Sequence, residues 1–76
     1  MEKFDRITLD PDVMGGKPCV RDTRVTVGTI VGLIAADHSV QEVLNAYPYL
    51  TKEDVQAALS YAAWRSEESE HVLPDT

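Results

Sequence analysis

The sequence predicts a mostly helical domain, in which three short helices form a helix-turn-helix core of the homeodomain-like or winged-helix-like kind and a short β-ribbon precedes them. Three observations predict this fold class. Apolar residues recur at helical spacing in three segments after residue 26, the links between these segments are short, and the segment 7–25 is rich in strand and turn formers. The 76 residues suffice for one domain, which we assign to residues 1–66, followed by an acidic C-terminal tail at residues 67–76.

The segment 7–25 is expected to form the ribbon. Residues 7–9 alternate as a short strand does, and Asp10-Pro11-Asp12 has the composition of a turn. Residues 19–20 and 24–25 are expected to be short extended pieces on either side of a turn at residues 21–23. Because two strands alone are marginally stable, the ribbon must lie against the helices.

The first helix is expected over residues 27–37, with Thr26 as its N-cap. Gly28 and Gly32 lie four residues apart on a side of this helix away from its apolar face. They either weaken the helix or allow a neighbouring backbone to approach closely, and we favour close approach. The apolar face consists of Val27, Ile30, Val31 and Ile34, widened by Leu33.

Two N-cap motifs mark the second and third helices. Ser39 and Glu42 have the spacing of a capping box, and Pro48 ends the helix that they begin. Thr51 is expected to cap the third helix, which continues through Trp64-Arg65, with Leu50 and Val55 placed for a hydrophobic staple. The predicted buried residues are Val40, Val43, Leu44 and Tyr47 in the second helix and Val55, Ala58, Leu59, Ala62 and Ala63 in the third.

The net charge of −6 is concentrated in the helical part of the chain. Residues 1–24 carry five bases and five acids, whereas residues 25–76 carry two bases and eight acids. The helical part therefore repels a phosphate backbone on average, and phosphate contacts are expected mainly from the first third of the chain.

Residue types that carry catalysis or bind metals form no recognisable pattern. The one cysteine, Cys19, and the two histidines, His38 and His71, have spacings that match no metal-ligand motif, and no nucleophile or phosphate-loop motif is present. We therefore expect no enzyme activity, cofactor, metal or small-molecule substrate. Because no apolar run suits a signal peptide or a membrane span, and a lone cysteine suits a reducing compartment, we expect a cytoplasmic protein without membrane contact.

An ordered series of motifs resembles a known family. The series runs through residues 7–11, 15–27, 33–36, 39–43 and 47–62, and it includes Gly15-Gly16-Lys17-Pro18, Thr23-Arg24-Val25 and Tyr47-Pro48-Tyr49-Leu50-Thr51. On these motifs the chain resembles the bacterial domain-of-unknown-function family numbered 433, which includes VapB-type antitoxins. The match covers roughly residues 7–64. The chain departs from the family pattern at Asp22 and Asp37, where glycine is usual; both sites are expected to have positive φ, which aspartate tolerates with small strain.

The resemblance implies a winged helix-turn-helix antitoxin that binds and neutralises a PIN-like ribonuclease toxin. By analogy with other antitoxins, it also implies binding of operator DNA, which the acidic charge supports only weakly, and we expect a homodimer. Two other functions stay open: a helix-turn-helix DNA-binding regulator without a toxin partner, and a protein-interaction adaptor.

Five polar side chains are candidates for contact with phosphates or with a partner protein. Arginines bind phosphate or carboxylate groups bidentately, and the third helix occupies the position of a recognition helix. Two alternatives stay open: one of the two arginines, with Arg24 favoured over Arg21, can instead pair with an acid such as Asp54 or Glu53 and hold the ribbon on the third helix. The exposed side of that helix can be a solvated face. The candidates are Lys17, Arg21, Arg24, Lys52 and Gln56.

Tyr49, Trp64, Val72 and Leu73 are the candidates for a protein interface. Aromatic residues often anchor interfaces, and Tyr49 and Trp64 lie off the predicted apolar stripes, whereas Tyr47 and Tyr61 follow them. Trp64 can instead cover an edge of the core. Val72 and Leu73 lie in the acidic tail, which either docks on a basic toxin or is disordered.

Overall fold

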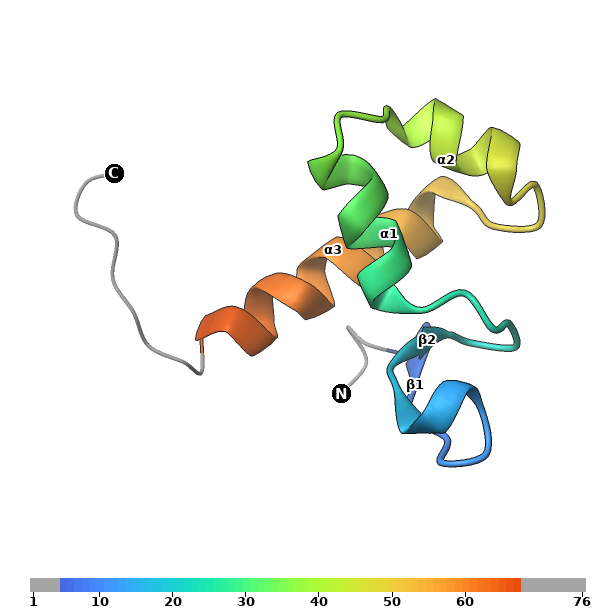
Figure 1. Ribbon diagram of the computed structural model, residues 1–76, viewed down its shortest axis with the longest axis vertical. Coiled ribbons are helices and arrows are strands. Elements are labelled where there is room, and N and C mark those ends of the chain that lie inside the picture. Colours follow the sequence, from blue (N-terminus) through green and yellow to red (C-terminus); the bar gives the residue numbers. More distant parts are fainter. Residues whose placement is uncertain (1–4, 68–76) are drawn as a thin grey trace.

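The computed structural model describes residues 5–67 as a short ribbon followed by three helices (Figure 1). The elements in chain order are β1 (Ile7–Thr8), the 3-10 helix η2 (Met14–Gly16), β2 (Cys19–Val20), α1 (Val27–Ala35), α2 (Val40–Ala46) and α3 (Lys52–Glu67). The predicted fold class, three helices with a short N-terminal β-ribbon, is confirmed.

The ribbon pairs β1 with β2 in antiparallel register, with Ile7 opposite Val20 and Thr8 opposite Cys19. Residues 24–25, expected to form another extended piece, do not form a strand. Instead the Val25 carbonyl accepts a hydrogen bond of 2.9 Å from the Val20 N–H, and Cys19 forms an isolated bridge with Thr26. Strand β2 therefore has backbone partners on both sides, which fixes the path of the chain into α1.

Helix α1 begins as predicted, because the Thr26 hydroxyl accepts a hydrogen bond of 3.0 Å from the Thr29 N–H. It ends at Ala35, two residues before the expected end. Asp37 has a φ of 77°, which no helix accommodates, and Asp22 in the ribbon has a φ of 66°. Both positive angles were predicted from the sequence, whereas the positive φ of 51° at Met14 was not.

Both predicted caps of the later helices form. Ser39 and Glu42 make a reciprocal capping box at the start of α2. At the start of α3 the Thr51 hydroxyl accepts a hydrogen bond of 3.1 Å from the Asp54 N–H. Helix α3 continues to Glu67, two residues past the expected Arg65.

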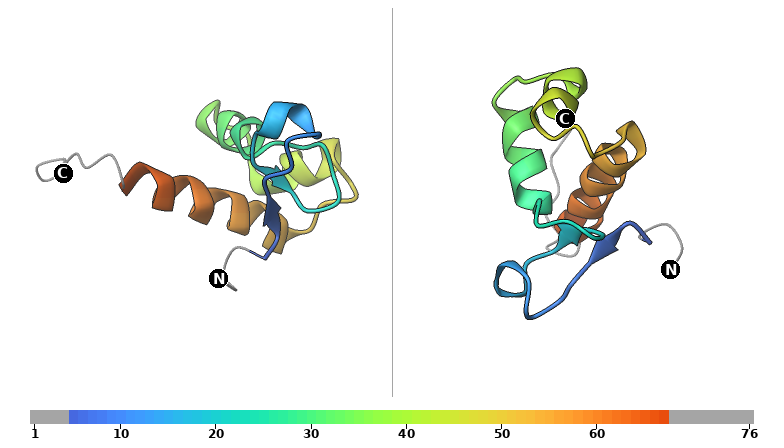
Figure 2. Two further views of the ribbon diagram at one scale, coloured as in Figure 1. Left: turned by 90° about the horizontal axis from the view of Figure 1, so that it is seen from below. Right: turned by 90° about the vertical axis from the view of Figure 1, so that its right-hand side faces the viewer.

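One apolar core joins the ribbon to all three helices. In the right-hand view of Figure 2, α1 and α3 lie on opposite sides, with α2 across one end and the ribbon across the other. Helix α1 packs mainly against α3. The predicted burial of Ala63 is wrong: it is exposed, because the buried face of α3 runs through Tyr61 and Ala57 instead. The core consists of Ile7, Val20, Val25, Val27, Ile30, Val43, Leu50, Val55, Ala57, Ala58 and Tyr61.

The two glycines of α1 do not serve close packing within the described part of the chain. A Cβ placed on Gly32 would have no neighbour within 4 Å, and one placed on Gly28 would meet only the Thr26 hydroxyl at 4.0 Å. The interpretation that a neighbouring backbone approaches these glycines is therefore wrong for residues 5–67. Within the same residues, no helix has the length and apolar character needed to cross a membrane.

Candidate functional site

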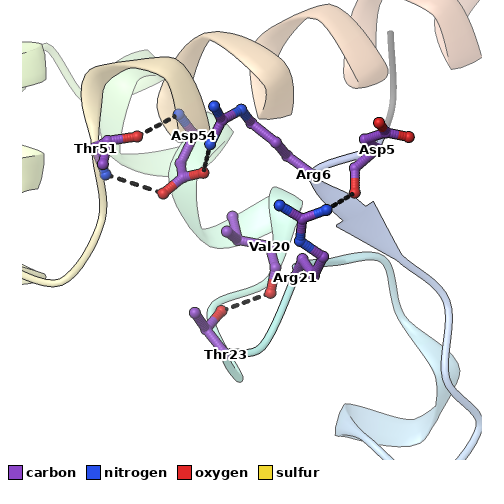
Figure 3. Close-up of polar contacts among 7 residues, drawn as sticks. All are labelled: Asp5, Arg6, Val20, Arg21, Thr23, Thr51 and Asp54. Carbon is purple, nitrogen blue, oxygen red and sulfur yellow. Dashed lines mark hydrogen bonds and ion pairs between the residues drawn. The ribbon is translucent and has the colours of Figure 1, made fainter. Parts of the chain in front are cut away.

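The ribbon is tied to α3 by one ion pair (Figure 3). The Arg6 guanidinium donates from Nη1 to Asp54 Oδ1 at 3.0 Å, and the two residues are 48 positions apart in the sequence. The Asp54 side chain is only 13% exposed, whereas Arg6 is 43% exposed. The prediction of an arginine that holds the ribbon on the third helix names the wrong residue: Arg6, and not Arg24, pairs with Asp54.

Asp54 also caps α3, so one carboxylate has two structural tasks. Its Oδ2 accepts a hydrogen bond of 2.9 Å from the Thr51 N–H, while its Oδ1 accepts from Arg6. The negative charge lies in the first turn of α3, where the helix dipole favours it. The position of the ribbon is therefore coupled to the start of α3.

Arg21, which directly follows β2, lies beside Arg6, which directly precedes β1. The Arg21 N–H donates to the Arg6 carbonyl at 2.6 Å, and the Arg21 guanidinium donates to the Asp5 carbonyl at 3.2 Å (Figure 3). The Arg21 side chain is exposed, and within residues 5–67 its guanidinium bonds only to a neutral carbonyl. Its positive charge is therefore available to a partner.

The turn that follows is held by side-chain hydrogen bonds. The Thr23 hydroxyl donates to the Val20 carbonyl at 2.8 Å and accepts from the Val25 N–H at 3.0 Å. This fixed turn presents Arg24, which is exposed. Arg24 lines an open hollow of about 380 Å³ together with Thr8, Asp10, Val13, Asp22 and Thr23.

Lys17 lies elsewhere, beside the first turn of α1. It is exposed and lines a second hollow, of about 550 Å³, with Pro18, Thr26, Val27, Gly28 and Thr29. The two hollows share no lining residue. The three candidate cations of the ribbon are thus spread around it and do not form one compact cluster.

The candidates on α3, Lys52 and Gln56, are both exposed. Glu53, which is also exposed, and Asp54 follow Lys52 directly in the first turn of the helix. The first turn of α3 therefore offers one cation next to acids, which is a weak site for a phosphate backbone.

The aromatic candidates lie toward opposite ends of α3. Tyr49 is 64% exposed and meets the Tyr47 ring edge-on at 6.3 Å. Trp64 is 39% exposed, its ring lies 5.8 Å from that of Tyr61, and the Arg65 guanidinium lies 6.0 Å from its centroid. Lys52, which begins the helix, and Trp64 are about 18 Å apart along its axis. Tyr49 and Trp64 therefore cannot form one small patch, and Val72 and Leu73 lie outside the described residues.

The side chains of Cys19 and His38 each lie beside a group of the chain that is close in sequence. Cys19 is 1% exposed, and its thiol lies 3.4 Å from the Lys17 carbonyl. His38 Nδ1 lies 3.3 Å from Glu42 Oε1 at the start of α2. Within residues 5–67, no three His, Cys, Asp or Glu side chains gather in a way that could hold a metal ion.

Sequence reasoning missed Arg6 and the double role of Asp54. Both had a signal: Arg6 directly precedes the predicted strand at residues 7–9, and Thr51 and Asp54 have capping-box spacing with aspartate in place of glutamate. The pairing of these two residues depends on how the ribbon crosses α3, which no local pattern contains.

Comparisons with known proteins agree with one another. A family model described as "Protein of unknown function (DUF433)" matches residues 7–62. The uncharacterized protein y4eO of Sinorhizobium fredii (strain NBRC 101917 / NGR234) is 45% identical over 56 residues, which are 74% of this chain and 25% of that protein. The crystal structure of a DUF433 member from Anabaena variabilis ATCC 29413 superimposes with a TM-score of 0.78 at 36% identity, over 83% of this chain and 62% of that one. The chain thus spans a quarter of the length of the curated relative.

Proposed function

We propose that this chain, which belongs to the DUF433 family, is an antitoxin-type module that binds and blocks a PIN-like ribonuclease. The resemblance of its motifs to VapB-type antitoxins suggests the partner. The arrangement of the ribbon supports the mode of binding.

The observation that carries the proposal is the exposed Arg24 on a turn whose backbone is already fixed. Thr23 bonds the turn from both sides, so presenting Arg24 to a partner requires little additional ordering. An arginine of this kind suits a carboxylate, because its guanidinium donates two parallel hydrogen bonds.

A nuclease supplies such carboxylates. Nucleases that use pairs of metal ions hold the metals with acidic side chains, so their active sites are negatively charged when the metal is absent. A guanidinium placed there would occupy the metal position and exclude the phosphate of the RNA. Arg21, three residues earlier and also exposed, offers a second cation to the same partner.

The charge of the chain favours this partner over DNA. All six net negative charges lie in residues 25–76, which include the helix in the recognition position. A regulator that binds operator DNA without a toxin, and an adaptor for another protein, are alternatives that the same experiment separates.

The test uses the product of the neighbouring gene, which the proposal expects to be a PIN-like ribonuclease, with binding measured by calorimetry and inhibition measured on a short RNA. We expect inhibition at equal molar amounts, and Arg24→Glu is expected to raise the Kd at least about tenfold, because the reversed charge repels the carboxylates. Lys52→Glu is the matched control: it reverses one exposed charge on α3 and should leave the Kd unchanged. Absence of binding, or an equal loss in both variants, would reject the proposal.

DNA binding is measured in the same series with a duplex from the upstream region. Affinity that falls steeply with salt and is lost in Lys52→Glu would assign the chain to the regulator class instead. Binding of the nuclease without inhibition would assign it to the adaptor class.

A further inference from the structure

Helix α1 has an exposed face without charge. Surface helices of globular proteins ordinarily carry charged residues on the side away from the core, but α1 and the residue that follows it contain none. The half-buried Val31 and Leu33 lie on either side of this face. Its exposed residues are Gly28, Thr29, Gly32, Ala35 and Ala36.

Nothing in the described part of the chain covers this face. The buried residues of α1, Val27 and Ile30, lie on the other side of the helix, and α1 packs mainly against α3. The positions where Cβ atoms of Gly28 and Gly32 would lie are open, and a glycine inside a helix costs about 1 kcal/mol relative to alanine. A helix face of small, uncharged residues allows the backbone of a partner to approach closely.

The two ends of α1 differ in charge. Lys17 lies in the hollow beside the first turn. At the other end, Glu42 lies with His38 in a hollow of about 290 Å³ that also includes Leu33 and Ala46. A partner helix therefore meets a positive end, an uncharged middle and a negative end.

We propose that this face binds α1 of a second copy of the chain, with the two helices antiparallel about a two-fold axis. In that arrangement Lys17 of each copy faces Glu42 of the other, so both charges are matched by the same contact made twice. At a net charge of −6 two copies repel each other over most of their surfaces, so a second copy can bind only at a face free of charge such as this one.

The interface must extend beyond the helices themselves. Nine residues give a helix about 14 Å long, which is too short to supply the roughly 800 Å² per partner of a standard interface. The two hollows at its ends supply the remaining area, and they hold the charged residues that determine the antiparallel direction. This inference rests on α1 and on the charged residues at its two ends, Lys17 and Glu42, and it is independent of the proposed nuclease contact at Arg24.

Sedimentation equilibrium of the 76-residue chain tests the proposal. We expect a dimer at micromolar to submillimolar concentration, and we expect Gly32→Glu to raise the dimer Kd at least about a hundredfold, because it places two like charges in an apolar contact. Gly32 has open space around it and glutamate favours helix more than glycine does, so the variant monomer should fold, which circular dichroism checks. Ser60→Glu on the exposed face of α3 is the matched control and should leave the Kd within about twofold.

The charge pairing has its own test. Lys17→Glu is expected to raise the dimer Kd at least about threefold, and this rise should shrink when Glu42→Gln is also present, because glutamine removes the facing charge and keeps an oxygen for the Ser39 N–H. A chain that is monomeric throughout, a dimer that Gly32→Glu does not weaken, or Lys17 and Glu42 effects that simply add would each overturn the proposal. The proposal would also be overturned if the nuclease bound at this face and a second copy did not.

Discussion

Helices α2 and α3 begin with nearly the same capping motif, but the acid of one motif contacts a nearby residue and the acid of the other contacts a distant one. In α2 the Ser39 hydroxyl accepts from the Glu42 N–H at 3.1 Å, and Glu42 accepts from the Ser39 N–H at 2.9 Å. In α3 Thr51 and Asp54 repeat this exchange at 3.1 and 2.9 Å. The difference lies in the second contact of each acid. Glu42 meets His38, four residues away, whereas Asp54 meets Arg6, 48 residues away.

Burial follows from that difference. The Glu42 side chain is 60% exposed and the Asp54 side chain is 13% exposed, because the ribbon lies over the start of α3 and no segment among residues 5–67 covers α2 in the same way. A capping box alone stabilises one helix end. A capping box whose acid also binds a distant arginine fixes two parts of the fold relative to each other. Here it holds the ribbon, and with it the turn that carries Arg24, on the start of α3.

The largest effect is expected at Asp54. Asp54→Ala removes the cap acceptor and leaves Arg6 without its carboxylate, so the unfolding free energy should fall by about 2 kcal/mol. Urea denaturation measures this loss, and hydrogen exchange should show faster exchange of the Val20 and Arg21 amides. Glu42→Ala is the matched variant in α2, with a smaller loss and no change in the ribbon amides. Equal losses in both variants would contradict the distinction between the two boxes.

The link before the α2 box should respond in the opposite direction. Asp37 has a φ of 77°, so Asp37→Gly relieves backbone strain and should raise the unfolding free energy by about 1 kcal/mol without touching the box itself. Asp22→Gly, at a φ of 66° in the ribbon, should act similarly. Asp37→Ala is the control, since alanine is disfavoured at this angle and should destabilise the protein. Thermal unfolding followed by circular dichroism distinguishes these signs.

A smaller effect is expected from the other half of the long-range pair. Arg6→Met keeps most of the apolar stem and removes the charge, and because Arg6 is 43% exposed the loss should be only about 0.5 kcal/mol. The same substitution in an Asp54→Ala background should cost almost nothing, since its partner is already absent. A full loss in both backgrounds would show that Arg6 acts through packing and not through Asp54.

The local features of this comparison could be predicted from the sequence, and the long-range ones could not. The Ser39 box, the Thr26 and Thr51 caps, and the positive φ of Asp22 and Asp37 each depend on a few neighbouring residues. The ion pair depends on the angle at which the ribbon crosses α3. The sequence does not contain this angle, and it therefore does not distinguish Arg6 from Arg24 as the partner of Asp54. The candidate cations Lys17 and Arg24 are seven residues apart in the sequence but line different hollows, which no local pattern predicts.

The smallest effect concerns acid. The pKa of Glu42 lies below its ordinary value of 4.5, first because the Ser39 N–H donates to the carboxylate and second because His38 lies beside it. A carboxylate whose pKa is lower in the folded state stabilises the fold above its unfolded pKa, and this contribution disappears as the pH falls through the lower, folded value. Glu42→Gln keeps an acceptor for Ser39 but does not titrate. The difference in unfolding free energy between the wild type and Glu42→Gln should therefore be constant above about pH 5 and should shrink toward zero in more acidic solution.

Gln41→Ala is the control for this measurement, because it alters an exposed side chain of the same helix without adding or removing a titrating group. Its unfolding free energy should run parallel to that of the wild type at every pH. If the Glu42→Gln difference also stayed parallel, the exposed box of α2 would hold its carboxylate no more firmly than water does. The contrast with α3 would then be complete, since only the acid that reaches the ribbon would contribute through its charge.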